Sequence, residues 1–301
     1  MKETRLTTEE LPGVRKDYKD TIFRRLFSEK KSLLSLYNAV NGSGYENPEE
    51  LEIVTLENAV YMNMRNDLAF VIDYSLHLYE HQSTYNPNMP LRNLFYVAKE
   101  LSMLVDENSL YRRSLVKIPT PRFIVFYNGI ENQPDQKYLR LSDAFECSLE
   151  EPDLELVVTV LNINPGKNVE LIDQCKPLKE YMIYVEKIRE YASHMLIEDA
   201  VERAVQECIR EGILEEFLKQ NRKEAVEVSI FEYNEELVMQ DVRKDEFSRG
   251  KKEGIEQGIE QGEERVNLLN KKLLAENRIT DLKRAMEDGG YRKKLYDEFG
   301  L

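Results

Sequence analysis

Residues 66–82 read Asn-Asp-Leu-Ala-Phe-Val-Ile-Asp-Tyr-Ser-Leu-His-Leu-Tyr-Glu-His-Gln, and this stretch decides how the rest of the chain is interpreted. Its dense apolar residues on either side of a short polar break predict a buried β-hairpin. Asp67 and Glu80 interrupt that pattern with carboxylates. Because burying an unpaired carboxylate costs several kcal/mol, acids on such apolar strands indicate a site that uses the charge, most simply by binding a cation.

The register of this hairpin brings the two acids together. A turn centred on Asp73-Tyr74 places Asp67 directly opposite Glu80, where Cβ atoms lie about 4.5–5.5 Å apart. Two bare carboxylates repel at that distance, and a divalent ion between them converts repulsion into chelation. Gln82 projects from the same face as Glu80 because side chains alternate along a strand. Asp-Tyr is not a favoured tight-turn pair, but a longer turn with the same centre preserves this register.

Two carboxylates on one face suit a particular metal chemistry. Mg²⁺ keeps several waters and is commonly held by one or two carboxylates plus phosphate oxygens, so Asp67 and Glu80 are candidate ligands for Mg²⁺ or Mn²⁺. Such an ion lowers the pKa of a bound water and neutralises charge in a phosphoryl transition state. Gln82 is neutral and cannot be a strong base, so its amide would orient the attacking water or hold the scissile phosphate.

The flanking sequence predicts a mixed α/β core with helices against a sheet. Apolar positions recur at helical spacing in 15–42 and 90–105, and the pattern becomes helical again from about residue 168. Short apolar runs predict strands. Besides the hairpin, the expected strands are 51–56, 122–127, 154–161 and a strand-like piece at 226–231.

The helix expected at 90–105 begins with Pro90, a residue that suits the first helical turn. Its apolar residues fall on one face, which we expect to pack against the sheet. These residues are Leu91, Leu94, Phe95, Ala98, Leu101 and Leu104.

Three regions are expected along the chain: a core at 1–166, a helical region at 167–245 packed on or following it, and a charged helical tail at 246–301. Glycines at four-residue steps lie in the tail, along one helical face. Each costs a helix about 1 kcal/mol relative to Ala. The repeat is therefore either a solvated linker helix or a seam for a homo-oligomer through the C-terminal helices, although sustained coiled-coil heptads are missing. The glycines are Gly250, Gly254, Gly258 and Gly262.

The charge of the chain limits its partners. The 301 residues include 42 Lys and Arg against 56 Asp and Glu, a net charge of −14, which argues against a surface that holds nucleic acid non-specifically. The acidity is uneven, since residues 1–125 carry 16 basic and 17 acidic side chains and residues 126–301 carry 26 and 39. The part with the hairpin is close to neutral and compatible with a phosphate-bearing substrate.

Cysteine usage and hydropathy favour a cytoplasmic protein. The three cysteines are widely spaced without a Cys-x-x-Cys motif, which argues against disulfides and zinc and favours a reducing compartment. The apolar runs are too short to span a bilayer, and the N-terminus is charged, so no membrane partner is expected. A serine or cysteine hydrolase has little support, because there is no Gly-x-Ser-x-Gly motif.

The order of the polar residues resembles a known nuclease pattern. An Asp at a strand start, Glu-x-Gln on the next strand and a following helix resemble the PD-(D/E)XK nuclease superfamily. Longer segments are more closely similar to the Rpn-type recombination-promoting nuclease, or putative transposase, family. The segments that carry this resemblance are Asn66–Leu68, Tyr79–Thr84, Asn86–Arg92, Tyr96, Asp20–Phe27, Phe126–Gly129 and Leu141–Phe145, together with the helical C-terminal half.

The resemblance implies a restriction-endonuclease-like mixed sheet flanked by helices and a Mg²⁺-dependent DNA endonuclease linked to recombination or transposition. It implies that Asp67 and Glu80 are the metal-binding acids and that Gln82 stands where the superfamily usually has Lys. Losing the ammonium removes one cation from the transition state. A second hypothesis is therefore a weakly active or inactive nuclease-fold protein that serves as a DNA-associated interaction or assembly module.

Two further residues are candidates, and three polar residues of the hairpin have other expected roles. Arg92, at the start of the following helix, either holds a phosphate or pairs with an acid such as Glu80. Asp20 matches a family position near the site, or is simply a charged residue on the first helix. Asp73 is expected to form the turn. The alternation of side chains directs His81 away from the site, and His77 is likewise expected in the core or on the surface.

Overall fold

The computed structural model describes residues 21–54, 67–147 and 149–301. The chain divides into two compact units, Met1–Glu236 and Leu237–Leu301. The expected core at 1–166 and most of the expected helical region at 167–245 lie together in the first unit. They do so because the helices after residue 166 share a hydrophobic core with the sheet.

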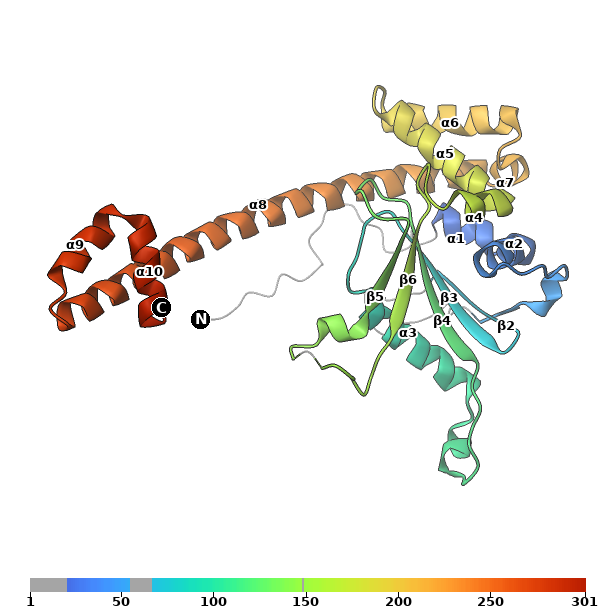
Figure 1. Ribbon diagram of the computed structural model, residues 1–301. Helices are drawn as coiled ribbons and strands as arrows, with labels where there is room; N and C mark the ends of the chain where they lie inside the picture. The colour runs from blue at the N-terminus through green and yellow to red at the C-terminus, as the bar shows by residue number, and fades with distance from the viewer. Residues whose placement is uncertain (1–20, 55–66, 148) are drawn as a thin grey trace, which may run out of the picture. The chain divides into compact units, whose positions relative to one another are not determined.

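The first unit is built on a six-stranded mixed sheet with the order β1-β2-β3-β4-β6-β5. The central neighbours β3, β4 and β6 run parallel, whereas β2 pairs antiparallel with both β1 and β3, and β5 pairs antiparallel with β6. The expected mixed α/β fold is therefore confirmed (Figure 1). The strands are β1 (Glu52–Ile53), β2 (Leu68–Ile72), β3 (Ser75–Gln82), β4 (Thr120–Tyr127), β5 (Gln136–Arg140) and β6 (Val157–Asn162).

The predicted hairpin is β2–β3, and its register is the expected one. Ile72 pairs with Ser75 and Leu68 pairs with Tyr79, so the turn is formed by Asp73-Tyr74. Asp73 has φ 46° and Tyr74 has φ 57°. Positive φ at both central residues is the geometry of a type I′ turn, which matches the twist of the strands it joins. The twist of the hairpin therefore outweighs the poor fit of these two residues to the left-handed region.

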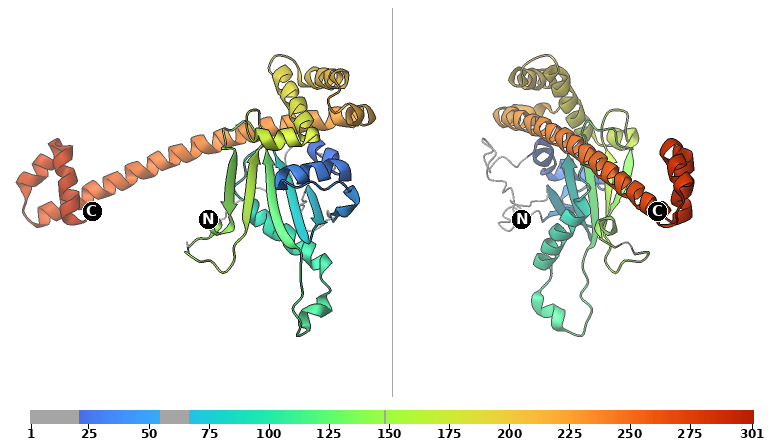
Figure 2. Two further views of the ribbon diagram at one scale, coloured as in Figure 1. Left: turned by 45° about the vertical axis from the view of Figure 1, so that its right-hand side comes forward. Right: turned by 90° about the vertical axis from the view of Figure 1, so that its left-hand side faces the viewer.

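Helices cover both faces of the sheet (Figures 1 and 2). The side chains of one face pack with α1, α2 and α4–α7, and those of the other face pack with α3. The helices of this unit are α1 (Ile22–Phe27), α2 (Lys30–Asn41), α3 (Met89–Leu104), α4 (Val169–Gln174), α5 (Lys176–Ala192), α6 (Ile197–Glu211) and α7 (Glu215–Gln220), and short 3₁₀ turns are η1 (Pro48–Glu50), η2 (Glu107–Tyr111) and η3 (Leu141–Ala144).

Helix α3 matches the expected span, but its buried face is only partly the expected one, since Leu94 and Leu101 pack against the apolar cluster on the sheet and other apolar residues do not. Leu91 and Phe95 are exposed, and so is Leu104 at the helix end. The face that packs on the sheet carries Asn93 and Glu100 instead, alongside apolar neighbours. The burial of Asn93 and Glu100 was not predictable, because a hydrophobic pattern assigns buried positions to apolar residues. The buried residues are Met89, Pro90, Asn93, Tyr96, Val97 and Glu100.

Two strand predictions need correction and one strand was missed. The piece at 226–231 is helical and belongs to α8 (Arg222–Ala275), where Ala225 and Val228 are buried. The strand expected at 51–56 is only β1, and residues 55–56 lie outside the described ranges. The edge strand β5 escaped prediction because it is mostly polar and exposed.

The second unit is helical. It contains the later part of α8, then α9 (Ile279–Glu287) and α10 (Gly289–Phe299), which enclose a small apolar core. Helix α9 ends at Glu287 and α10 begins at Gly289, where the Asp288 side chain caps the helix by accepting from the Tyr291 amide. The repeated glycines lie within α8, and a Cβ added at any of them would meet no atom within 4 Å.

Two expectations from composition concern the whole chain. Cys147, Cys175 and Cys208 are all free thiols, of which Cys147 is exposed and the other two are buried. Among the described residues, none of the helices has both the length and the apolar character needed to cross a membrane.

Candidate active site

The Glu80 carboxylate is at the centre of the candidate site. Glu80 lies near the end of β3 on the face covered by α3, and only 3% of the residue is exposed. Its Oε2 lies 3.3 Å from Arg92 Nη2, whereas its Oε1 is buried and accepts no hydrogen bond from the described residues. A buried carboxylate oxygen without a donor is costly, so this atom is available to a ligand.

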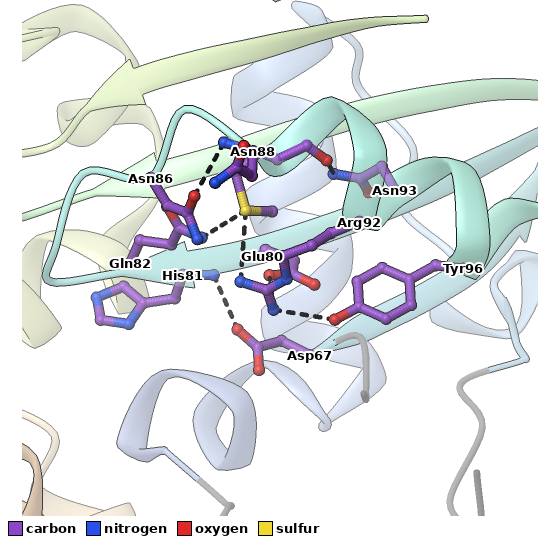
Figure 3. A network of polar contacts seen from close by, with 10 residues as sticks. Asp67, Glu80, His81, Gln82, Asn86, Asn88, Arg92, Asn93 and Tyr96 are labelled. Atoms are coloured by element: carbon purple, nitrogen blue, oxygen red, sulfur yellow. Dashed lines mark hydrogen bonds and ion pairs between the residues drawn. The ribbon is translucent and has the colours of Figure 1, made fainter. Parts of the chain in front are cut away.

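Asp67 lies beside Glu80, as the register predicts. It directly precedes β2, one position beyond the Leu68–Tyr79 pair. Its Oδ2 accepts a hydrogen bond of 2.8 Å from the His81 amide, which fixes the carboxylate against β3 (Figure 3). Burial, and the negative charge of Asp67, raise the pKa of Glu80 well above the ordinary value of a glutamate.

Arg92 and Tyr96 approach the acids from α3. The Arg92 Nη2 donates to the Tyr96 hydroxyl over 2.9 Å, one helical turn further along, while also facing Glu80 (Figure 3). Of the two roles expected for Arg92, pairing with Glu80 is the one the structure contains. The guanidinium lowers the pKa of Glu80, but burial and the Asp67 charge exceed its effect.

Gln82 follows Glu80 on the same face of the sheet, at the last position of β3. Its Nε2 contacts the Met89 sulfur at the start of α3 (Figure 3). The amide therefore lies at the junction of the strand, the loop at 83–88 and the helix. A side chain here is placed to contact a ligand that reaches Glu80 from the loop side.

The two histidines of β3 face away from the acids, as alternation predicts. The His81 ring stacks on Phe23 with 4.9 Å between centroids, and its Nε2 lies 3.0 Å from the Tyr181 hydroxyl. Burial lowers the pKa of His81 to about 3 and that of His77 to about 4, so both are neutral at pH 7. Neither ring is placed for proton transfer at the acids.

Several contacts around His81 were not predictable from the residue types. The Asn128 carbonyl, at the end of β4, accepts from Arg189 Nη1 over 2.7 Å. The other end of Arg189 donates to both oxygens of Glu236, at 3.0 and 3.1 Å. Gly129 is required next to Asn128, because a Cβ there would be 2.1 Å from the Ser83 carbonyl oxygen. Main-chain atoms take part in the contacts of Asn128 and Gly129, and such atoms are common to all residue types.

Lys137 is a further cation on the face that carries Glu80. Aligned residues across the sheet are Glu80, Val125, Val160 and Lys137, one on each of four adjacent strands. Neighbouring strands are about 4.8 Å apart, which places the Lys137 Cα roughly 14 Å from that of Glu80. Lys137 Nζ donates to the Tyr85 hydroxyl over 2.8 Å and lies over its ring. This cation is within reach of the loop at 83–88 that borders the acids.

The remaining sequence candidates are not part of this group. Asp73 lies exposed in the hairpin turn, at the other end of β3 from Glu80. Asp20 lies outside the described residues.

The residues present fit a lightly coordinated divalent ion. Within the described ranges, no group of three or more His, Cys, Asp or Glu side chains is arranged to hold a metal. Asp67 and Glu80 would supply two carboxylates, a number that suits Mg²⁺ and leaves positions for water and phosphate oxygens. The atom that supports such a site is Glu80 Oε1, which is buried and has no hydrogen-bond partner in the part of the chain that the structure describes.

No family model, curated protein or solved structure matches this chain. The fold and the candidate site are those of an α/β protein with a six-stranded mixed sheet and two neighbouring carboxylates at the open end of its β2–β3 hairpin.

Proposed function

We propose that the chain is a metal-dependent DNA endonuclease of the PD-(D/E)XK type, with Asp67 and Glu80 as the ligands of Mg²⁺ or Mn²⁺. The observation that carries the proposal is the buried Glu80 carboxylate, one oxygen of which has no partner among the described residues, adjacent to a second acid across the hairpin. Structural carboxylates in a core normally have all their acceptors satisfied. The nuclease class, DNA as the substrate and the link to recombination or transposition come from the sequence resemblance.

The side chains around the acids have separate roles in this proposal. The His81 amide donates to one oxygen of Asp67, so the backbone of β3 holds this carboxylate in place. Gln82 orients the attacking water or holds the scissile phosphate through its amide. Arg92 and Lys137 supply the positive charge that a DNA backbone requires on this face of an otherwise acidic chain. A bound divalent ion would acidify the attacking water and neutralise charge on the phosphoryl group.

A second candidate function is a nuclease-fold module that binds DNA or a protein partner without cutting. Two observations favour it. Gln82 supplies no cation, and Arg92 already neutralises one oxygen of Glu80. An Arg that satisfies the acid permanently would stabilise the fold and exclude a metal from the site.

Cleavage of supercoiled plasmid DNA by the full chain separates the two functions. The nuclease proposal expects nicking in Mg²⁺ or Mn²⁺ and none in EDTA. Glu80→Gln and Asp67→Asn should each lower the rate at least about a hundredfold, the size of effect typical for loss of a group that stabilises a transition state. Asp73→Asn is the matched control, because it removes an acid from the same hairpin at its far end and should cleave as the parent does. Full activity in Glu80→Gln would refute the assignment, and inactivity of the parent in both metals would favour the module.

A further inference from the structure

The sheet opens between β4 and β6. The parallel ladder between these strands stops at the Ile124–Thr159 pair. Both strands nevertheless continue, β4 back to Thr120 alongside β3 and β6 back to Val157 alongside β5. A hollow of about 690 Å³ lies where the two strands part. Volumes of this order accommodate small organic ligands.

This hollow is distinct from the candidate active site. It lies toward the beginning of β4, whereas Glu80 and Gln82 pair with the end of that strand. Neither acid of the candidate site lines it, and nor does Arg92. A ligand in the hollow would therefore not compete with a substrate for those side chains.

One part of the lining is apolar. Leu94 and Leu101 on α3 and Phe123 on β4 are half-buried and pack against the apolar cluster under α3. The apolar part of a ligand bound here would shield these side chains from water. Each methylene group removed from water contributes favourable free energy, so the apolar part supplies affinity.

The opposite part of the lining contains a buried histidine. His77 is 3% exposed, and neither Nδ1 nor Nε2 has a partner among the described residues. Its ring is fixed by stacking on Phe70 at 5.2 Å and by the edge of Tyr37 at 5.1 Å. Burial keeps the ring neutral, so one nitrogen carries a donor proton. Such a donor next to a hollow is placed to bind a ligand acceptor.

Arg122 adds a positive charge beside that donor. It is the cross-strand neighbour of His77, lines the same hollow and makes no ion pair with a described residue. The acid in the lining, Glu155, is already occupied: it accepts from the Ser142 amide and hydroxyl and pairs with Arg140. The charge left available to a ligand is therefore that of Arg122.

We propose that this hollow binds a small carboxylic acid with an apolar body, whose carboxylate accepts hydrogen bonds from Arg122 and His77 and whose apolar part packs against Leu94, Leu101 and Phe123. The site does not depend on the nuclease proposal, because it shares none of its residues.

Calorimetric titration of the full chain with octanoate tests the proposal, with octanol as the neutral counterpart. Octanoate should bind at least about tenfold more tightly than octanol, the effect of one charge-assisted hydrogen bond. Shortening the acid should weaken binding by about fourfold per methylene. Arg122→Gln should weaken octanoate about tenfold and leave octanol unchanged. Arg113→Gln, an exposed arginine of the preceding loop, should change neither.

Two further variants complete the test. His77→Phe keeps the ring stacking and removes both nitrogens, so octanoate should bind more weakly. If a thermal unfolding curve shows that His77→Phe does not fold, the octanoate affinity of Arg122→Gln still tests the proposal, because Arg122 is exposed. Asp67→Asn should bind octanoate as the parent does, even where it abolishes cleavage. The proposal is overturned by absence of octanoate binding at millimolar concentrations, by equal binding of octanol, or by unchanged affinity in Arg122→Gln.

Discussion

Arg92 lies with its Nη2 3.3 Å from Glu80 Oε2, so a cation on α3 is the counter-ion of the buried acid on β3. A third of the Arg92 side chain is exposed to solvent, against 4% for Glu80. The arginine can therefore swing into water at small cost, whereas the acid cannot move out of the core. This asymmetry makes Arg92 the partner that a metal ion would displace.

Arg92→Gln should strengthen metal binding. The guanidinium competes with the ion for Glu80 and repels it, so its removal favours the ion, and Gln retains a donor for the carboxylate. We expect the affinity for Mn²⁺, measured by calorimetry, to rise about threefold to tenfold, equivalent to roughly 1 kcal/mol. Arg112→Gln, an exposed substitution remote from the acids, is the control. Weaker Mn²⁺ binding by Arg92→Gln would contradict displacement, because it would mean that Arg92 supports the bound ion.

Gln82→Lys should increase the rate of DNA cleavage. A lysine at this position adds a cation next to the phosphate that the proposed mechanism places near Glu80. The single-turnover rate should rise about tenfold or more, as expected for a positioned charge in the transition state. Gln82→Met has a similar length without charge or amide and should be slower than the parent. If Gln82→Lys, Gln82→Met and the parent cleave DNA at the same rate, Gln82 takes no part in the reaction.

Glu100 should make stability depend on pH. The residue is 1% exposed, its Oε1 has no donor among the described residues, and burial raises its pKa to about 7. Because the folded pKa exceeds the ordinary value of 4.5, the folded state favours the protonated form. That stabilisation is complete below about pH 4.5 and is lost as the pH rises through about 7.

Glu100→Gln removes this titration while keeping the shape of the neutral side chain. We expect the two proteins to be nearly equal in free energy of unfolding at about pH 5, and the variant to be more stable by about 2 kcal/mol at about pH 9. Denaturant unfolding at both pH values measures the difference. If the difference in free energy of unfolding between the two proteins is the same at both pH values, Glu100 does not titrate in this range.

The turn of the hairpin can be improved without touching the acids. Asp73 and Tyr74 both adopt positive φ, a conformation that costs an ordinary residue about 1 kcal/mol. Replacing the pair by Asn-Gly, which favours the type I′ turn, should raise the free energy of unfolding by about 1–2 kcal/mol. Tyr74 is 87% exposed, so its removal sacrifices little packing. Lower stability in this double variant would mean that the register is not set by the turn.

The register of β2–β3 was predictable because side chains alternate with a fixed period, so one correct turn position determines every pair, including the approach of Asp67 to Glu80. The bond from the His81 amide to Asp67 was not predictable, since backbone donors are common to all residues. The buried face of α3 was only partly predicted: Leu94 and Leu101 pack as expected, whereas Asn93 and Glu100 occupy core positions that a hydrophobic pattern gives to apolar residues.

Local preference also failed at two other elements. Residues 226–231 contain β-branched and aromatic side chains typical of a strand, yet they lie in α8, where Ala225 and Val228 pack into the core. Burial of a helical face outweighs propensity differences of a few tenths of a kcal/mol per residue. The strand β5 has the opposite character, with polar residues on an edge where only one side of the backbone is paired.

The central claim is that Asp67 and Glu80 together hold one divalent ion. Its most direct test is the affinity of the full chain for Mn²⁺ in the absence of DNA, measured by calorimetry for the parent, Glu80→Gln and Asp73→Asn. We predict one Mn²⁺ per chain in the parent and in Asp73→Asn, and at least about tenfold weaker binding in Glu80→Gln, the loss expected when a ligand charge is removed. Equal affinity in the parent and Glu80→Gln would contradict the account.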